Sequence, residues 1–136
     1  NAKRTEALGL GAHATLNSRD PKEIEAAAVK FDLILSTVNV GLDWGAYINT
    51  LKPKGRLHFL GATLEPIELN VFSLIMAQRQ VSGSPVGSPA VIAQMLEFAA
   101  HHQIEPVTEH FKFDQANEAL ARLKSGAARY RIVLSR

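Results

Sequence analysis

The chain contains no cysteine, so disulfide bonds, thiolate catalysis and thiolate zinc sites are excluded within its 136 residues. No apolar run approaches the ~20 residues of a membrane-spanning helix, and no signal-peptide pattern is visible. No basic run is interleaved with aromatic residues, and the net charge is only +2, which gives little support to nucleic-acid or membrane binding. The absence of cysteine says little about the compartment, but nothing in the sequence suggests secretion, and we expect a cytoplasmic protein. A phosphate-bearing small molecule needs only a few placed cations and stays open as a ligand.

Residue constellations for catalysis are also missing. His101 and His102 are adjacent and would point about 100° apart on a helix, so both cannot face one ion. The other three histidines fall on different expected strands, and no Ser-His-Asp order or paired carboxylates stand out. We therefore expect neither a metal site nor a complete active site in this chain.

What is present is a repeated order of strands and helices. Apolar runs without alternation indicate buried parallel strands, and the segments between them have helical patterns. The expected helix caps are Asp20, Asn70 and Asp114, and Glu23 is expected to close a capping-box-like pair with Asp20. The length suits one domain, 1–136. The predicted fold is α/β, a mostly parallel, doubly wound sheet. The expected strands are 13–16, 31–36, 56–60, 80–82, 105–111 and 130–134, with helices at 3–8, 21–29, 42–51, 71–78, 89–101 and 114–123, and a turn at 53–55.

Three expected strands end in small residues, namely Thr37-Val38, Gly61-Ala62 and Gly83-Ser84. Parallel strands bring their carboxyl ends to one edge of the sheet, where ligands of such folds bind. Glycine at a strand end lets a flat ligand or another backbone come close. The pattern predicts a ligand lying across this edge, although each glycine is also explained by an ordinary turn.

Two groups of cations could meet phosphates. Lys3 and Arg4 lie on one helical turn. Arg129 and Arg131 flank Tyr130 in the last expected strand and should point to the same face. On spacing alone, a solvated helix face is the favoured explanation of the first pair, and an edge strand with charged outer positions explains the second pair equally well.

Taken together, six segments resemble the C-terminal part of zinc-dependent medium-chain alcohol dehydrogenases, specifically the cinnamyl-alcohol-dehydrogenase-like branch. They cover essentially the whole chain in the order and spacing of that family. The segments are KRTEALGLGAHATLNSRD (3–20), FDLILSTV (31–38), LKPKGRLHFLGA (51–62), GSPVGSP (83–89), MLEFAAHHQIEP (95–106) and NEALARLKSGAARYRIVL (117–134).

The resemblance implies the C-terminal part of an NADP(H)-binding Rossmann domain that lacks its first two strands, followed by a helix-strand return segment. It also implies an oxidoreductase that transfers hydride between nicotinamide and an alcohol or aldehyde. The residues it assigns to the cofactor are Lys3 and Arg4 near the adenosine 2′-phosphate, Thr37 and Val38 along the cofactor, Gly61, Ala62, Ser84 and Val86 near the nicotinamide, and Arg131 at the pyrophosphate.

The same resemblance places the glycine-rich phosphate turn and the zinc ligands in segments that would precede Asn1. The chain begins without Met and already in a helical pattern, so we expect a piece of a longer protein, inactive alone. A zinc-free quinone or enoyl reductase, and a non-catalytic nucleotide- or partner-binding module, remain alternatives.

Two structural expectations follow from the missing strands. Strands 13–16 and 31–36 should either pair directly or leave a gap that another segment or a second copy fills. The resemblance also implies a homodimer formed through a sheet edge, for which 82–89 is the candidate segment.

Overall fold

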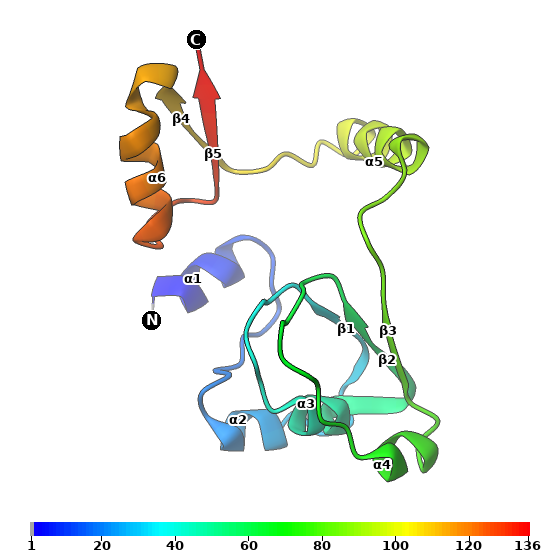
Figure 1. Ribbon diagram of the computed structural model, residues 1–136. Coiled ribbons are helices and arrows are strands. Elements are labelled where there is room, and N and C mark those ends of the chain that lie inside the picture. The colour runs from blue at the N-terminus through cyan, green and yellow to red at the C-terminus, as the bar shows by residue number, and fades with distance from the viewer. Residues whose placement is uncertain (1) are drawn as a thin grey trace. The chain divides into compact units, whose positions relative to one another are not determined.

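The computed structural model describes residues 2–136, which divide into two compact units, one ending at Pro85 and one running from Val86 to Arg136 (Figure 1). Each unit has its own parallel sheet. The α/β class and the parallel pairing are confirmed, but the strands form two sheets where the sequence analysis expected one. The single domain stays a prediction.

The first unit is built on a three-stranded parallel sheet in the order β1-β2-β3, with β1 at Phe31–Ser36, β2 at Leu51–Phe59 and β3 at Gln80–Gly83. The turn predicted at 53–55 is wrong, because β2 runs through it. Instead of a turn, the structure has an irregularity in the pairing of β1 with β2, where the register shifts between Phe31 and Leu33 of β1. The three carboxyl ends lie at one edge of the sheet, as predicted.

Four short helices belong to this unit: α1 (Ala2–Gly9), α2 (Pro21–Glu25), α3 (Trp44–Thr50) and α4 (Val71–Ile75). Asp20 and Asn70 cap α2 and α4 as predicted, each by accepting a backbone N–H at 3.0 Å. Glu23 does not close a capping box, because its carboxylate accepts from the N–H of Asn17 instead. Helices α2, α3 and α4 are shorter than their sequence patterns suggest.

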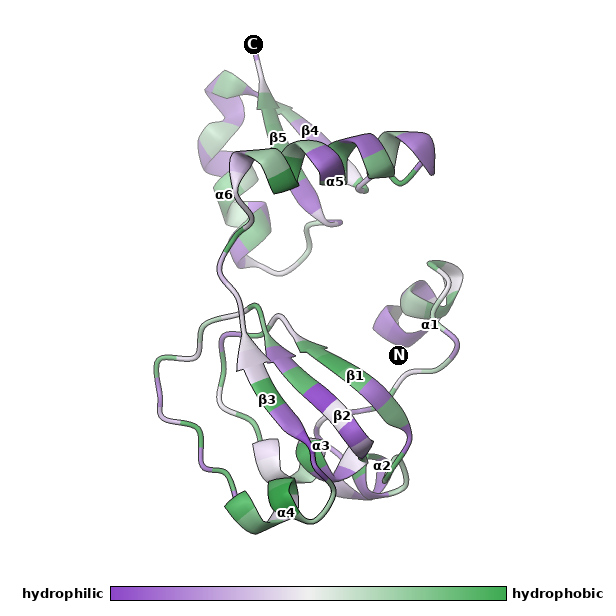
Figure 2. Cartoon of the chain, turned by 90° about the vertical axis from the view of Figure 1, so that its right-hand side faces the viewer, coloured by the Kyte–Doolittle hydropathy of each residue, from purple (hydrophilic) through white to green (hydrophobic). Residues whose placement is uncertain are grey.

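The core of this unit lies on one face of the sheet. Trp44 and Ile48 of α3 pack with Leu51 and Leu57 of β2. In Figure 2 helix α3 lies behind the sheet. Leu33 and Leu35 of β1 share one face of their strand and are both about half exposed, which marks the opposite face of the sheet as open. Since neighbouring residues of a strand point to opposite faces, Leu57 is buried while His58 stands on the open face.

The predicted strand at 13–16 is wrong: this segment is irregular. Within residues 2–136, β1 pairs only with β2, so direct pairing of 13–16 with 31–36 is also wrong. The physical reason is the absence of a neighbouring strand, because an isolated extended segment leaves its backbone groups unpaired. The alternative, that another segment or copy completes this edge of β1, stays a prediction.

The second unit contains α5 (Pro89–His101), β4 (Thr108–Lys112), the short 3₁₀ helix η1 (Phe113–Gln115), α6 (Ala116–Lys124) and β5 (Arg131–Ser135). Strands β4 and β5 are parallel. Asp114 lies inside η1 and does not cap α6, which has no side-chain cap. Arg129 precedes β5, so it does not share a strand face with Arg131 as predicted. No helix among the described residues is long and apolar enough to span a membrane.

An ion pair links α6 to β4 in this unit. The carboxylate of Glu109 accepts hydrogen bonds from Nε and Nη2 of Arg122, the latter at 2.9 Å, and from the backbone N–H of Arg129 at 2.8 Å. The hydrogen bond from Arg122 is the largest cause that lowers the pKa of Glu109 below its usual range, against a smaller opposing effect of burial. A carboxylate with a lowered pKa stabilises the fold above its unfolded-state pKa, and that stabilisation is lost as the pH falls through its folded-state value.

We therefore expect Glu109→Gln to lower the thermal stability of the protein at neutral pH. The difference from wild type should be constant above about pH 5 and shrink as the pH falls from the ordinary glutamate pKa of about 4.3 toward the lower pKa of the folded protein, where the wild-type carboxylate also loses its charge. Melting curves of both proteins from pH 3 to 8 measure this difference. A difference that does not change with pH would contradict the charged role of Glu109.

Candidate functional site

The strand exits of the first unit lie in close contact. The backbone N–H groups of Leu60 and Gly61 both donate to the carbonyl of Ser36, at 2.8 and 3.0 Å, just after β2 and at the end of β1. The N–H of Ser84 donates to the carbonyl of Phe59 at 3.2 Å, which joins the exits of β2 and β3 in the same way. The three small-residue exits therefore form one continuous surface at the carboxyl edge of the sheet, called the ledge below. It consists of Thr37-Val38, Gly61-Ala62 and Gly83-Ser84.

Gly61 is required by this close approach. A Cβ on Gly61 would collide with the carbonyl oxygen of Val38 and would lie 2.7 Å from the carbonyl carbon and 2.8 Å from the oxygen of Thr37. These are backbone atoms, which cannot rotate away as the end of a side chain can. The structure therefore brings Thr37, Val38 and Gly61 together, as predicted.

A pocket of about 380 Å³ opens beside the exits of β2 and β3. Gly61 and Ala62 line it together with Gly83, and Ile67 and Leu69 form an apolar wall. Small residues on one side and apolar side chains on the other suit a flat ring better than a charged group.

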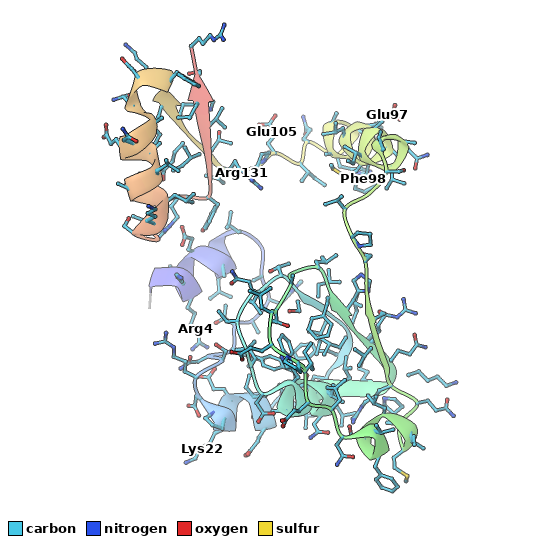
Figure 3. All side chains as sticks on the ribbon, in the orientation of Figure 1. Arg4, Lys22, Glu97, Phe98, Glu105 and Arg131 are labelled. Carbon is cyan, nitrogen blue, oxygen red and sulfur yellow. The ribbon has the colours of Figure 1, made fainter. Side chains whose placement is uncertain are left out.

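The predicted phosphate-binding cations line a second pocket, of about 610 Å³, between α1 and the segment that leads into α2. Lys3 and Arg4 are both exposed here, and Figure 3 shows Arg4 projecting from α1 on the side of α2. Arg19 lines the same pocket and was not predicted. Only the folded chain brings Arg19 into the same pocket as Lys3.

One acidic group lines this pocket, the carboxylate of Glu23. It accepts the N–H of Asn17 at 2.8 Å and so holds the turn that carries Arg19. Three cations against one carboxylate give the pocket a positive balance. Lysine binds a phosphate as a point charge and arginine as a planar fork, so the donor set fits a phosphomonoester.

The remaining predicted residues are placed by the structure as follows. Ser84 is exposed and follows β3, and its hydroxyl is held by His58, a residue to which the sequence analysis assigned no function. Val86 is the first residue of the second unit and is 89% exposed. Arg131 is exposed and begins β5 (Figure 3). The assignment of all these residues to a cofactor stays a prediction.

The described residues form no zinc-binding site. Residues 2–136 bring together no group of three His, Asp or Glu side chains that could hold a metal ion. The donor set of the described residues therefore does not fit a zinc centre.

Comparison with known proteins gives consistent relatives. The family model described as zinc-binding dehydrogenase matches residues 1–101. The chain is 60% identical over 133 residues to an aldehyde reductase of Synechocystis sp. and 39% identical over 132 residues to an NADP-dependent alcohol dehydrogenase of Mycolicibacterium smegmatis. These alignments cover 98% and 97% of the chain but 40% and 38% of the relatives.

A solved structure agrees with these relatives. A cinnamyl alcohol dehydrogenase from Sorghum bicolor superposes with a TM-score of 0.90 at 39% identity, over 98% of this chain and 38% of that one. The chain thus spans about two fifths of the length of the proteins it matches.

Proposed function

The chain belongs to the zinc-binding dehydrogenase family, and from this membership we propose that it is the cofactor-binding part of an NADP(H)-dependent alcohol or aldehyde oxidoreductase. The observation that carries the choice of NADP(H) is the pocket lined by Lys3, Arg4 and Arg19. A 2′-phosphate distinguishes NADP(H) from NAD(H), and three cations from two segments of the chain match its charge.

At the other end of the cofactor, the ledge formed by the strand exits would receive the nicotinamide ring. When bound, NADPH supplies a hydride to the carbonyl carbon of an aldehyde, and NADP⁺ accepts one from an alcohol. The residues of this chain bind and orient the cofactor: Gly61 leaves room at the edge, and Ser84 offers a hydroxyl to the carboxamide. Arg131 is proposed as a further phosphate contact. Zinc is expected on residues outside this chain.

The partners form part of the same proposal. The substrate class is a small alcohol or aldehyde, with no nucleic acid and no membrane surface involved, and the location is cytoplasmic. Within the described residues the outer edge of β3 pairs with no other strand, which supports a homodimer formed by edge pairing. A zinc-free reductase receives less support, because the relatives are named as alcohol and aldehyde enzymes.

Lys3→Ala tests the proposal in the full-length protein. Losing a charge-assisted hydrogen bond costs about 1.5–3 kcal/mol, so the Kd for NADPH should rise roughly 10- to 150-fold. NADH lacks the 2′-phosphate, so its Kd should change little. Fluorescence titration with each cofactor measures both values.

Lys22→Ala is the matched control, because Lys22 is an exposed lysine of α2 that does not line the pocket (Figure 3). It should leave both Kd values unchanged. If Lys3→Ala binds NADPH as wild type does, and wild type binds NADH equally well, Lys3 is not a phosphate ligand and the choice of NADP(H) fails.

A further inference from the structure

His58 bridges two serines on the open face of the first unit's sheet. Its Nδ1 lies 2.9 Å from the hydroxyl of Ser82, and its Nε2 lies 2.9 Å from the hydroxyl of Ser84. His58 and Ser82 face each other across β2 and β3 in the strand register, but Ser84 lies one residue beyond the end of β3. The imidazole therefore reaches past the paired strands to hold the first residues of the exit.

Both ring nitrogens are satisfied by this arrangement. A neutral imidazole has one donor and one acceptor, and a serine hydroxyl can play either part. If Nε2 accepts, Ser84 donates its hydrogen to the ring and presents its oxygen lone pairs outward. If Nε2–H donates, the hydrogen of Ser84 is available to an outside acceptor. The tautomer of His58 thus determines whether the exposed hydroxyl of Ser84 can donate a hydrogen bond to a ligand or only accept one.

Ser84 is held at two points, both on β2. Its N–H donates to the carbonyl of Phe59, and its hydroxyl contacts His58. The backbone bond fixes where the residue lies, and the side-chain bond fixes where its hydroxyl points. An exposed serine without such a partner would sample its rotamers freely and would lose that freedom on binding a ligand.

We propose that His58 is a positioning residue for the nicotinamide end of the cofactor, acting through the hydroxyl of Ser84. This rests on the proposed function, in which the strand exits receive the nicotinamide carboxamide. A carboxamide has both an N–H donor and a carbonyl acceptor, which is the complement of an oriented hydroxyl.

Two substitutions of His58 separate its two contacts. The amide of glutamine reaches about as far as Nε2, whereas the amide of asparagine reaches only about as far as Nδ1. His58→Gln should therefore keep the contact with Ser84, and His58→Asn should keep only the contact with Ser82. The two ligands to titrate into the full-length protein are NADPH and 2′-phospho-ADP-ribose, which has the adenosine end of the cofactor but no nicotinamide.

We expect His58→Asn to raise the Kd for NADPH about three- to tenfold, the effect of one hydrogen bond, and to leave the Kd for 2′-phospho-ADP-ribose unchanged. His58→Gln should bind both ligands within about twofold of wild type. Ser84→Ala should reproduce the selective loss of His58→Asn, and it supplies the same test if a His58 variant fails to fold.

Arg56→Leu is the control for general damage to this face. Arg56 lies two residues before His58 in β2, further from the exits, and makes a comparable cross-strand contact by donating to Oε1 of Gln80 at 2.7 and 3.1 Å. Loss of this contact should not alter the Kd for NADPH. Equal weakening of both ligands by His58→Asn, or none, would overturn the positioning role. A wild-type protein that binds 2′-phospho-ADP-ribose but gains nothing from the nicotinamide would also overturn it. A wild-type protein that binds neither ligand would instead refute the proposed function, and this inference with it.

Discussion

Gly61→Ala is expected to disrupt the strand exits and to weaken cofactor binding and stability together. The added Cβ would collide with the carbonyls of Thr37 and Val38, which follow directly after Ser36, and the carbonyl of Ser36 accepts hydrogen bonds from Leu60 and Gly61. Overpacking of this kind costs about 1–3 kcal/mol, and backbone neighbours place it toward the upper end. Because the same contact shapes the ledge for the nicotinamide, the Kd for NADPH should rise at least about tenfold.

Gly9→Ala is the matched control. A Cβ on Gly9 meets nothing within 4 Å, and Gly9 ends a helix in which alanine is the better residue. This substitution should leave the melting temperature and the Kd for NADPH unchanged or raise stability slightly. Thermal melts and NADPH titrations of both variants provide the comparison. Wild-type binding by Gly61→Ala would show that the ledge is not part of the cofactor site.

The second large effect is expected from Leu57→Ala, which should destabilise the first unit by about 2–5 kcal/mol. Leu57 is 0% exposed and packs with Trp44, Ile48 and Leu51, so its truncation leaves a cavity in the centre of the core. Trp44 also packs edge-to-face against Phe59, with ring centroids 4.8 Å apart. The carbonyl of Phe59 accepts the hydrogen bond that the N–H of Ser84 donates. The core and the strand exits are therefore mechanically linked.

Urea denaturation measures this loss, with Leu64→Ala as the control because Leu64 is 99% exposed. The control should lose less than about 0.5 kcal/mol. The comparison with the neighbouring position is informative as well: Leu57→Ala should lower stability strongly, whereas His58→Asn should alter NADPH binding with little change in stability. Similar losses for Leu57→Ala and Leu64→Ala would contradict the assignment of the core.

The chemistry of single residues and short segments was readable from the sequence. Asp20 and Asn70 begin helices because their side chains accept backbone N–H groups two residues on, which is a local interaction. The strands at 31–36 and 80–82 were predicted within one residue because their apolar runs are bounded by polar or glycine-rich turns. The family resemblance rested likewise on short motifs, and the comparisons confirm it.

Contacts between segments far apart in the chain were decided only by the tertiary structure. Residues 13–16 have the pattern of a strand but form none, because a strand needs a neighbour with which to exchange hydrogen bonds. Folding brings Arg19 into the same pocket as Lys3, 16 positions away in the chain. It also places His58 between Ser82 and Ser84, which are 24 and 26 positions away. Such pairings leave no local periodicity in the sequence. The sequence alone therefore predicted the small residues and two of the three cations of the candidate site, Lys3 and Arg4, and the fold decided which of them meet and which side chains orient them.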